Sequence, residues 1–143
     1  MSDEATEVVL EQFAAVNERD FQRAMDLYAD DVVLLVPASE AVTNPGLYEG
    51  KKAVGEWFGD WFRTFAADYR FEIREARKLD GDLIFLLATH GGRGRLSGAQ
   101  VQGENAYLYR VRGGMIVRVG FFATREEALD AASLPEWSQP ETD

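Results

Sequence analysis

Residues 82–124 contain three apolar, strand-like segments separated by turn signals, and this stretch constrains the fold more than any other. The turns are indicated at residues 95–98 and at Gly113-Gly114, and Asp80-Gly81-Asp82 precedes the first segment. Segments rich in Val, Ile, Phe and Tyr between short turns are typical of antiparallel strands joined as hairpins. We therefore expect a sheet of consecutive antiparallel strands that forms the back wall of a pocket.

The alternation of side chains within this sheet predicts which face lines the pocket. Residues 69–74 alternate apolar and charged side chains, whereas residues 83–88 are apolar on both faces, as in a central or covered strand. In the strand at residues 99–112, one face carries Ala99, Val101, Gly103, Asn105, Tyr107, Tyr109 and Val111. We expect this face to be the concave one.

Helical spacing dominates the first half of the chain. Apolar residues at helical spacing predict helices at residues 3–17, after Asp20 and at residues 51–66. The third helix carries an aromatic stripe that must pack on a sheet, formed by Val54, Trp57, Phe58, Trp61, Phe62 and Phe65. Residues 32–36 form a strand that ends at Pro37, and residues 38–50 form a loop. Thr124 opens a capping box that begins a final helix through Ala132.

The order of these elements places the chain in the α+β class, with three N-terminal helices packed on a curved, mostly antiparallel sheet and a short C-terminal helix. Such a cone leaves a cavity between helices and sheet. At 143 residues, the chain has the size of one domain. We assign residues 1–134 to this domain and residues 135–143 to a loose acidic tail, in which Trp137 is the side chain that could dock.

Charge and composition limit the kinds of partner and cofactor that we expect this protein to bind. The net charge of −10 argues against nucleic acid and anionic membranes, and no segment approaches the length of a membrane span. The chain has no cysteine, so disulfides, thiolate metal sites and a Cys nucleophile are excluded. With an acidic N-terminus that does not look like a signal peptide, we expect a cytoplasmic protein without metal or cofactor.

Several segments resemble the NTF2-like superfamily. Phe13–Asn17 with Asp20 and then Tyr28–Val32 resembles its helix–turn–helix–strand opening, and Tyr48–Val54 is similar to its entry into the third helix. Tyr107–Arg112 with Gly114–Val117 resembles its penultimate hairpin. Arg125–Leu129 is similar to a C-terminal signature of the SnoaL-like branch. The resemblance covers roughly residues 5–132 and implies the same cone-shaped fold.

The resemblance also implies where catalytic groups would lie, and this chain departs from both known patterns. Ketosteroid isomerase-like relatives carry a carboxylate base just before the proline that ends the first strand, where this chain has Val36. Their oxyanion hole pairs a first-helix tyrosine with a protonated acid on the sheet. The matching positions here are about Gln12 and Tyr107, and polyketide cyclases resemble this pattern in placing their acid at the Tyr107 position. The fold alone therefore does not carry the activity over.

The remaining candidates form a small polar set. His90 titrates nearest to neutral pH and is the best acid/base candidate, with Tyr107 beside it as the second catalytic candidate. The alternative for His90 is a structural histidine at a strand end, and for Tyr107 it is core packing. The expected ligand-binding residues are Gln12, Val36, Tyr48, Trp57, Trp61, Asn105, Tyr109 and Phe121.

Two minor expectations concern acidic residues. Glu75 continues the parity of the inward-facing positions on its strand, but a bulge after Ile73 would turn it to solvent, and we favour the bulge. Asp30-Asp31 is interpreted as a helix end and turn rather than as a metal site.

Three functions fit these residues. The first is a SnoaL-like protein that binds a small hydrophobic or carbonyl-bearing molecule and catalyses cofactor-free proton transfer of the isomerase, cyclase or dehydratase type. The second is a ligand-binding module without turnover, and the third is an interaction module. We also expect a homodimer through the outer sheet face, where an exposed apolar patch would be formed by Leu83, Phe85, Leu87, Ala106 and Leu108.

Overall fold

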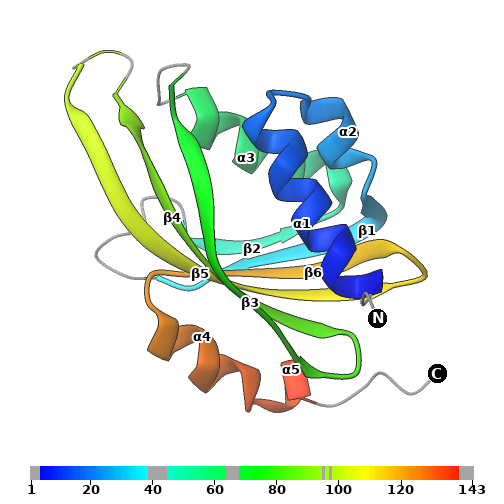
Figure 1. Ribbon diagram of the computed structural model, residues 1–143. Helices are drawn as coiled ribbons and strands as arrows, with labels where there is room; N and C mark the ends of the chain where they lie inside the picture. The colour runs from blue at the N-terminus through cyan, green and yellow to red at the C-terminus, as the bar shows by residue number, and fades with distance from the viewer. Residues whose placement is uncertain (1–3, 39–44, 64–67, 95, 97, 139–143) are drawn as a thin grey trace.

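The chain folds into one curved sheet with helices on both faces (Figure 1). The computed structural model describes residues 4–38, 45–63, 68–94, 96 and 98–138. In chain order its elements are α1 (Glu4–Asn17), α2 (Phe21–Met25), β1 (Tyr28–Val36), β2 (Gly46–Glu49), α3 (Lys51–Arg63), β3 (Arg70–Asp80), β4 (Leu83–Arg93), β5 (Gln100–Arg112), β6 (Met115–Phe122), α4 (Arg125–Ala132) and α5 (Pro135–Ser138).

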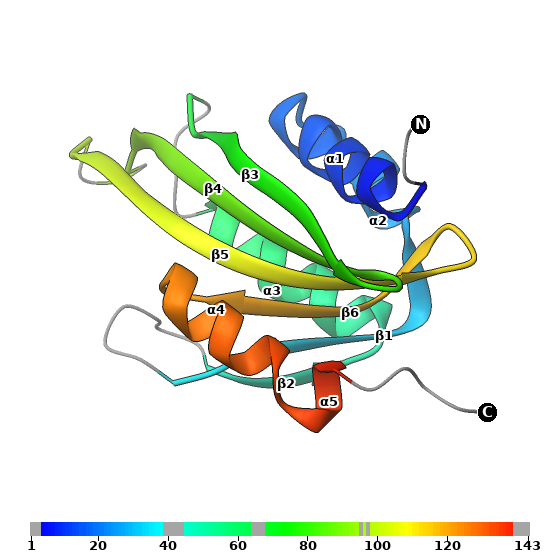
Figure 2. The ribbon, with the colours of Figure 1, turned by 60° about the horizontal axis from the view of Figure 1, so that its bottom comes forward.

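The single sheet contributes side chains from both of its faces, one face to an inner core and the other to an outer core. Among the described residues its strand order is β2-β1-β6-β5-β4-β3, and every pair is antiparallel except the parallel pair β1–β6. Helices α1, α2 and α3 cover the concave face, whereas α4 and α5 lie on the opposite face (Figure 2). Because side chains alternate along each strand, one sheet serves both cores. The predicted α+β cone is confirmed.

The boundaries of β1 and β2 differ from the predicted ones. Strand β1 begins at Tyr28 rather than Val32, because Tyr28 pairs with Ile116 of β6 before an irregular stretch. The pair Asp30-Asp31 therefore lies exposed within this strand, and its interpretation as a helix end was wrong. Residues 46–49, expected in a loop, pair with β1 as an added edge strand.

Bulges set which side chains of the later strands face inward. The register of β3 on β4 shifts between Ile73 and Glu75, as predicted, and Glu75 leaves the inner face to pair with Arg125 of α4. A second shift, between Arg110 and Val111, changes the parity of β6. As a result, the fully buried Ile116 joins Val119 and Phe121 in the inner core, although strict alternation along the strand would place it on the opposite face.

The edge strand β3 is hydrogen-bonded to α1 through the Asn17 side chain, beside the packing of Phe13 on Phe71. The Asn17 amide donates to the carbonyl oxygen of Phe71 at 2.9 Å and accepts from its N–H at 2.8 Å. This pair of hydrogen bonds replaces the missing neighbour strand. It fixes α1, which carries Gln12 and Phe13, against the sheet.

The outer face corrects two expectations about the C-terminus. The expected exposed patch is covered by the chain itself, since Leu83, Phe85 and Leu108 are fully buried in a cluster with α4 and Trp137. Trp137 was placed in a loose tail, but its side chain is fully buried on α5. Arg118 lies over its ring at 4.8 Å, and the buried Arg110 donates to its carbonyl oxygen. Residues 139–143 of the expected tail lie outside the described residues.

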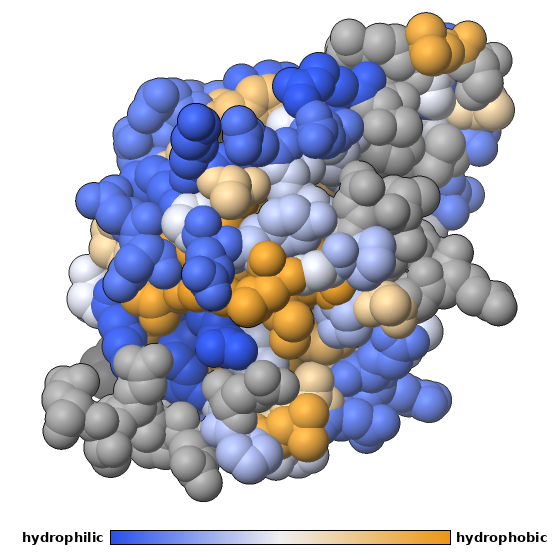
Figure 3. Space-filling view, turned by 180° about the vertical axis from the view of Figure 1, so that it is seen from behind, coloured by the Kyte–Doolittle hydropathy of each residue, from blue (hydrophilic) through white to orange (hydrophobic). Residues whose placement is uncertain are grey.

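The surface seen from behind is charged at its margins and has a group of apolar side chains near its middle (Figure 3). Half-buried Val33 and Leu35 of β1 lie on the outer side of the sheet, and Leu35 pairs with Leu47 of β2, which is 54% exposed. Among the described residues, no helix is long and apolar enough to cross a membrane.

Candidate ligand-binding site

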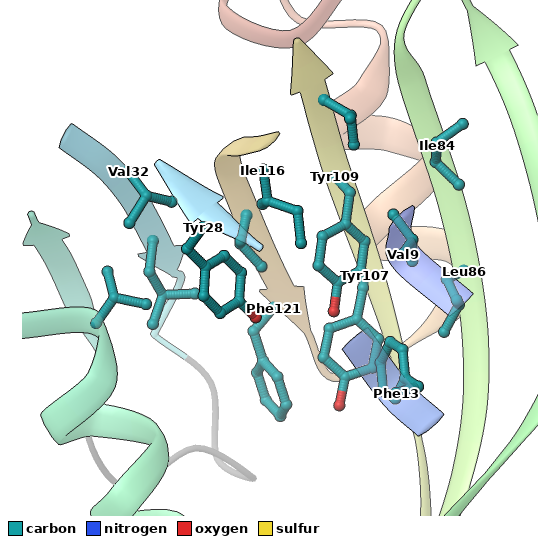
Figure 4. Packing of buried hydrophobic residues seen from close by; sticks show 14 of the residues in the cluster. Val9, Phe13, Tyr28, Val32, Ile84, Leu86, Tyr107, Tyr109, Ile116 and Phe121 are labelled. Atoms are coloured by element: carbon teal, nitrogen blue, oxygen red, sulfur yellow. The ribbon is translucent and has the colours of Figure 1, made fainter. Parts of the chain in front are cut away.

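A cavity lies between α1, α3 and the inner face of the sheet, and we call it the aromatic pocket. Nine of its eleven described lining side chains are Phe, Trp or Tyr, and eight of these nine come from α3 and the sheet rather than from α1. It is lined by Gln12, Phe13, Val16, Trp57, Phe58, Trp61, Phe62, Phe71, Tyr107, Tyr109 and Phe121. Figure 4 shows Tyr107 and Tyr109 side by side on β5, with Phe13 of α1 packed against them.

The pocket is narrow in this conformation. Its hollow measures about 320 Å³ when the part open to solvent is included, but the space open to the centre of a water molecule is only about 20 Å³. That space holds roughly one or two waters. A ring-sized ligand therefore requires at least one aromatic wall to move.

The walls are aromatic side chains in mutual contact. Trp57 and Trp61 are stacked with ring centroids 5.9 Å apart, one turn apart on α3. Phe121 of β6 meets both indoles edge to face, at 5.4 and 5.6 Å, and meets Tyr107 at 5.4 Å. Edge-to-face contacts of this kind favour defined ring orientations. The pocket is thus a shaped apolar site.

Two polar groups of the pocket remain available to a ligand. Tyr109 donates from its hydroxyl to Gln12 Oε1 at 3.2 Å, which fixes the buried amide. The Gln12 amide nitrogen and the Tyr107 hydroxyl have no hydrogen-bond partner among the described residues. Burial raises the pKa of both Tyr107 and Tyr109 well above the ordinary value, because a buried phenolate loses its hydration. Both phenols are neutral near pH 7 and act as hydrogen-bonding groups.

His90 and Asn105 lie on the same inner face but outside the lining of the aromatic pocket. His90 is half-buried among Trp61, Tyr69 and Phe71, with ring centroids 5.5–6.2 Å away. Burial lowers its pKa, so its imidazole is neutral near pH 7. Of the two catalytic candidates, Tyr107 is therefore among the described lining residues of the aromatic pocket and His90 is not.

The other expected site residues divide between the pocket and its surroundings. Gln12, Trp57, Trp61, Tyr107, Tyr109 and Phe121 line it. Val36 is fully buried in the inner core instead. Tyr48 lies on β2, where its ring contacts Trp57 at 6.4 Å. Neither is among the lining residues.

Sequence reasoning did not assign five of the lining residues to the site: Phe13, Val16, Phe58, Phe62 and Phe71. All five belonged to the apolar faces predicted for α1, α3 and β3. Periodicity identifies such a face as buried, but a core and a pocket lining have the same pattern. The missing information was the angle at which α1 and α3 cross the sheet.

Chemically, the aromatic pocket is uncharged. The part of its lining that the structure describes contains no Asp, Glu, His, Lys or Arg. Among the described residues, no group of three or more His, Asp or Glu side chains is placed to hold a metal ion. The site can bind an apolar or aromatic molecule and hydrogen-bond to one of its oxygen or nitrogen atoms.

Comparison with known proteins shows which family has this sequence pattern and this fold. The sequence signature of the SnoaL-like domain matches residues 9–119, which is most of the chain. The protein therefore belongs to the SnoaL-like family, with the NTF2-like fold. A comparison with proteins of curated function found no significant match.

Several solved structures share the fold at low sequence identity. TerC, crystallised with polyporic acid, is 17% identical with a TM-score of 0.72, and the match covers 90% of this chain and 97% of TerC. RV0760c from Mycobacterium tuberculosis, in complex with estradiol-17beta-hemisuccinate, is 19% identical with a TM-score of 0.72, over 87% of this chain and 97% of that one. A protein from Catenulispora acidiphila with a ketosteroid isomerase-like fold, in complex with trimethylamine, is 20% identical with a TM-score of 0.69, and the match covers 94% of this chain and 98% of that one.

Proposed function

We propose that this protein binds a small hydrophobic or carbonyl-bearing molecule in the aromatic pocket. The observation that carries the proposal is the aromatic lining together with the free amide nitrogen of the buried Gln12. Apolar walls with a few placed polar groups are typical of small-molecule sites. Neighbours of the same fold crystallised with polyporic acid and with a steroid ester support this choice of ligand size and character.

Gln12 and Tyr107 would set the orientation of the ligand. The Gln12 amide donates to a ligand carbonyl, and it is held in place by the bond that its own oxygen accepts from Tyr109. The neutral Tyr107 hydroxyl both donates and accepts. Neither group is charged, so the ligand that fits best is itself uncharged where it contacts them.

A second candidate function is cofactor-free proton transfer, of the isomerase, cyclase or dehydratase type. The observation that favours it is His90, whose neutral imidazole has its Nδ1 buried without a hydrogen-bond partner among the described residues. Such a group can exchange a proton near pH 7. Binding without turnover is the first choice, because the described lining residues of the aromatic pocket include no Asp, Glu, His, Lys or Arg.

The test is a thermal-shift screen of planar aromatic and carbonyl compounds, followed by two variants on each hit. A bound ligand raises the midpoint of unfolding in a concentration-dependent way. We expect Gln12→Leu to weaken binding about five- to tenfold by removing one hydrogen bond, and Tyr107→Phe to weaken it by a similar factor. Gln22→Leu, at an exposed position of α2, is the matched control and leaves affinity unchanged. A hit that is insensitive to both pocket variants would refute this site.

A homodimer through the outer sheet face is compatible with this function. The aromatic pocket opens on the concave side, so a second copy on the convex side would not block it.

A further inference from the structure

Three polar atoms on the inner face of the sheet are buried without a hydrogen-bond partner among the described residues. One is the Tyr28 hydroxyl on β1, and the other two, His90 Nδ1 and Asn105 Oδ1, lie on the adjacent strands β4 and β5. Neither His90 nor Asn105 belongs to the described lining of the aromatic pocket. Buried polar groups in folded proteins are nearly always paired. Two unpaired groups on adjacent strands therefore indicate a place where a further polar group is accommodated.

The strand register brings the two side chains close together. Asn105 of β5 pairs with Ala88 of β4, and His90 pairs with Gly103, so the two residues are diagonal neighbours on one face. Diagonal neighbours on adjacent strands lie roughly 7–8 Å apart, within reach of one shared group between their side chains. Gly103 leaves room for the imidazole, because a Cβ there would lie 2.9 Å from His90 Nε2.

Trp61, which lines the aromatic pocket, also contacts His90 of the polar pair, as does Phe71. The Trp61 ring meets His90 at 6.0 Å, and it also meets Phe121 and Trp57, which line the pocket. Its indole N–H donates to the Tyr69 hydroxyl at 3.0 Å. Movement of this one side chain would therefore join the pocket to the polar pair.

Two features make Trp61 the wall that moves. The space inside the pocket is too small for a ring, so some wall must yield to admit one. Trp61 lies in the last turn of α3, just after Gly59, and glycine weakens a helix locally. Trp57, Tyr107 and Phe121 are almost fully buried, whereas Trp61 is half-buried and is in direct contact with His90.

We propose that Trp61 is the gate of a polar subsite formed by His90 and Asn105, and that the ligand is an elongated aromatic molecule with a hydroxyl group at one end. The aromatic part occupies the aromatic pocket. The hydroxyl donates to Asn105 Oδ1 and accepts from the N–H of the neutral His90 at Nδ1, so both orphaned atoms gain a partner. This inference rests on the proposed function, because it extends the same binding site.

The test compares two probes with the same biphenyl body, 4-phenylphenol and 4-methoxybiphenyl, which differ by one methyl group and of which only the first can donate from its oxygen. By calorimetry on the full chain, we expect 4-phenylphenol to bind about tenfold more tightly, the effect of one buried hydrogen bond. Asn105→Leu lowers this ratio to about one and leaves the affinity for 4-methoxybiphenyl within about twofold. His90→Phe keeps the ring contacts with Trp61 and Tyr69 but removes an N–H that the oxygen of either probe can accept, so we expect it to weaken both probes about five- to tenfold and to leave the ratio unchanged. This second variant keeps the polar subsite testable if Asn105→Leu does not fold. Gln102→Leu, exposed on β5, is the control and keeps the wild-type ratio.

The gate is tested by the association rate in stopped-flow fluorescence. We expect Tyr69→Phe, which removes the hydrogen bond to Trp61, to speed the entry of 4-phenylphenol several-fold, and an unchanged rate would overturn the gate. Equal affinity of the wild-type protein for the two probes would overturn the polar subsite while leaving the aromatic pocket as the binding site. Absence of binding by either probe, together with no hit in the broader thermal-shift screen, would overturn the proposed function itself.

Discussion

At the scale of single residues, the burial of His90 predicts that the free energy of unfolding depends on pH. It is the only histidine of the chain and is half-buried among Trp61, Tyr69 and Phe71, none of which is charged near neutral pH. Burial lowers its pKa below the ordinary value of about 6.5, because the imidazolium loses hydration. The unfolded chain therefore binds more protons than the folded chain as the pH falls through that value.

This difference predicts the direction of the stability change. The free energy of unfolding is expected to decrease as the pH falls from about 6.5 toward the folded-state pKa, and to keep its full value above it. The histidine Cε1 proton gives one NMR signal, whose titration midpoint should lie below about 6.5. His90→Phe should remove this part of the slope in urea unfolding between about pH 5.5 and 8. A midpoint at or above the ordinary value would contradict the burial of His90.

The site residues differ in how far the sequence could place them. Gln12, Tyr107 and Tyr109 were predicted from the alternation of side chains along a strand and from positions matched to the family. A small change in how the helices pack alters neither kind of evidence. His90 was named with Tyr107 as a catalytic candidate, and the structure places its ring against Trp61. The position of one indole ring depends on how α3 packs, and no pattern in the sequence encodes that angle.

At the scale of elements, the strands of strong periodicity were predicted and the weakly patterned ones were not. Strands β4 and β5 follow from alternation and turn residues, because hairpins are local. Strand β2 has only four residues and forms because β1 offers a free edge, which is a tertiary effect. Helix α5 was missed for the same reason, since its four residues are held by Trp137 rather than by helical propensity.

The docking of α5 gives a prediction about stability. Trp137→Ala removes a fully buried indole from the outer core and leaves a cavity beside Leu108 and Phe122. We expect a loss of about 3–5 kcal/mol in the free energy of unfolding, measured by urea denaturation. The control is Leu134→Ala, because Leu134 lies three residues away with 48% of its surface exposed, and it should change stability by about 0.5 kcal/mol or less. Equal effects of the two substitutions would mean that Trp137 is not part of the core in solution.

At the scale of the whole molecule, the two cores assign separate roles to the two faces of the sheet. The concave face holds the aromatic pocket, and the central part of the convex face is covered by α4 and α5. The residues first expected to bind a second copy are therefore not available to it. The convex side that remains open lies over β1 and β2, where Val33, Leu35 and Leu47 keep apolar surface in contact with solvent.

This remaining surface relocates the expected homodimer. We predict that two copies associate through the outer side of β1 and β2, with α5 in place, and that light scattering gives twice the chain mass of 16.0 kDa. Leu47→Asp should return the protein to the mass of one chain, because a carboxylate at the centre of an apolar contact must lose its hydration without gaining a partner. Leu10→Asp, at an exposed position of α1 on the other side of the molecule, should leave the dimer intact.

A stable interface needs roughly 600–1,000 Å² from each copy. Three side chains supply less than this area, so the contact must extend along the edge strand β2. A wild-type mass of one chain at all concentrations would show that the cover formed by α4 and α5 is sufficient and that the protein acts alone.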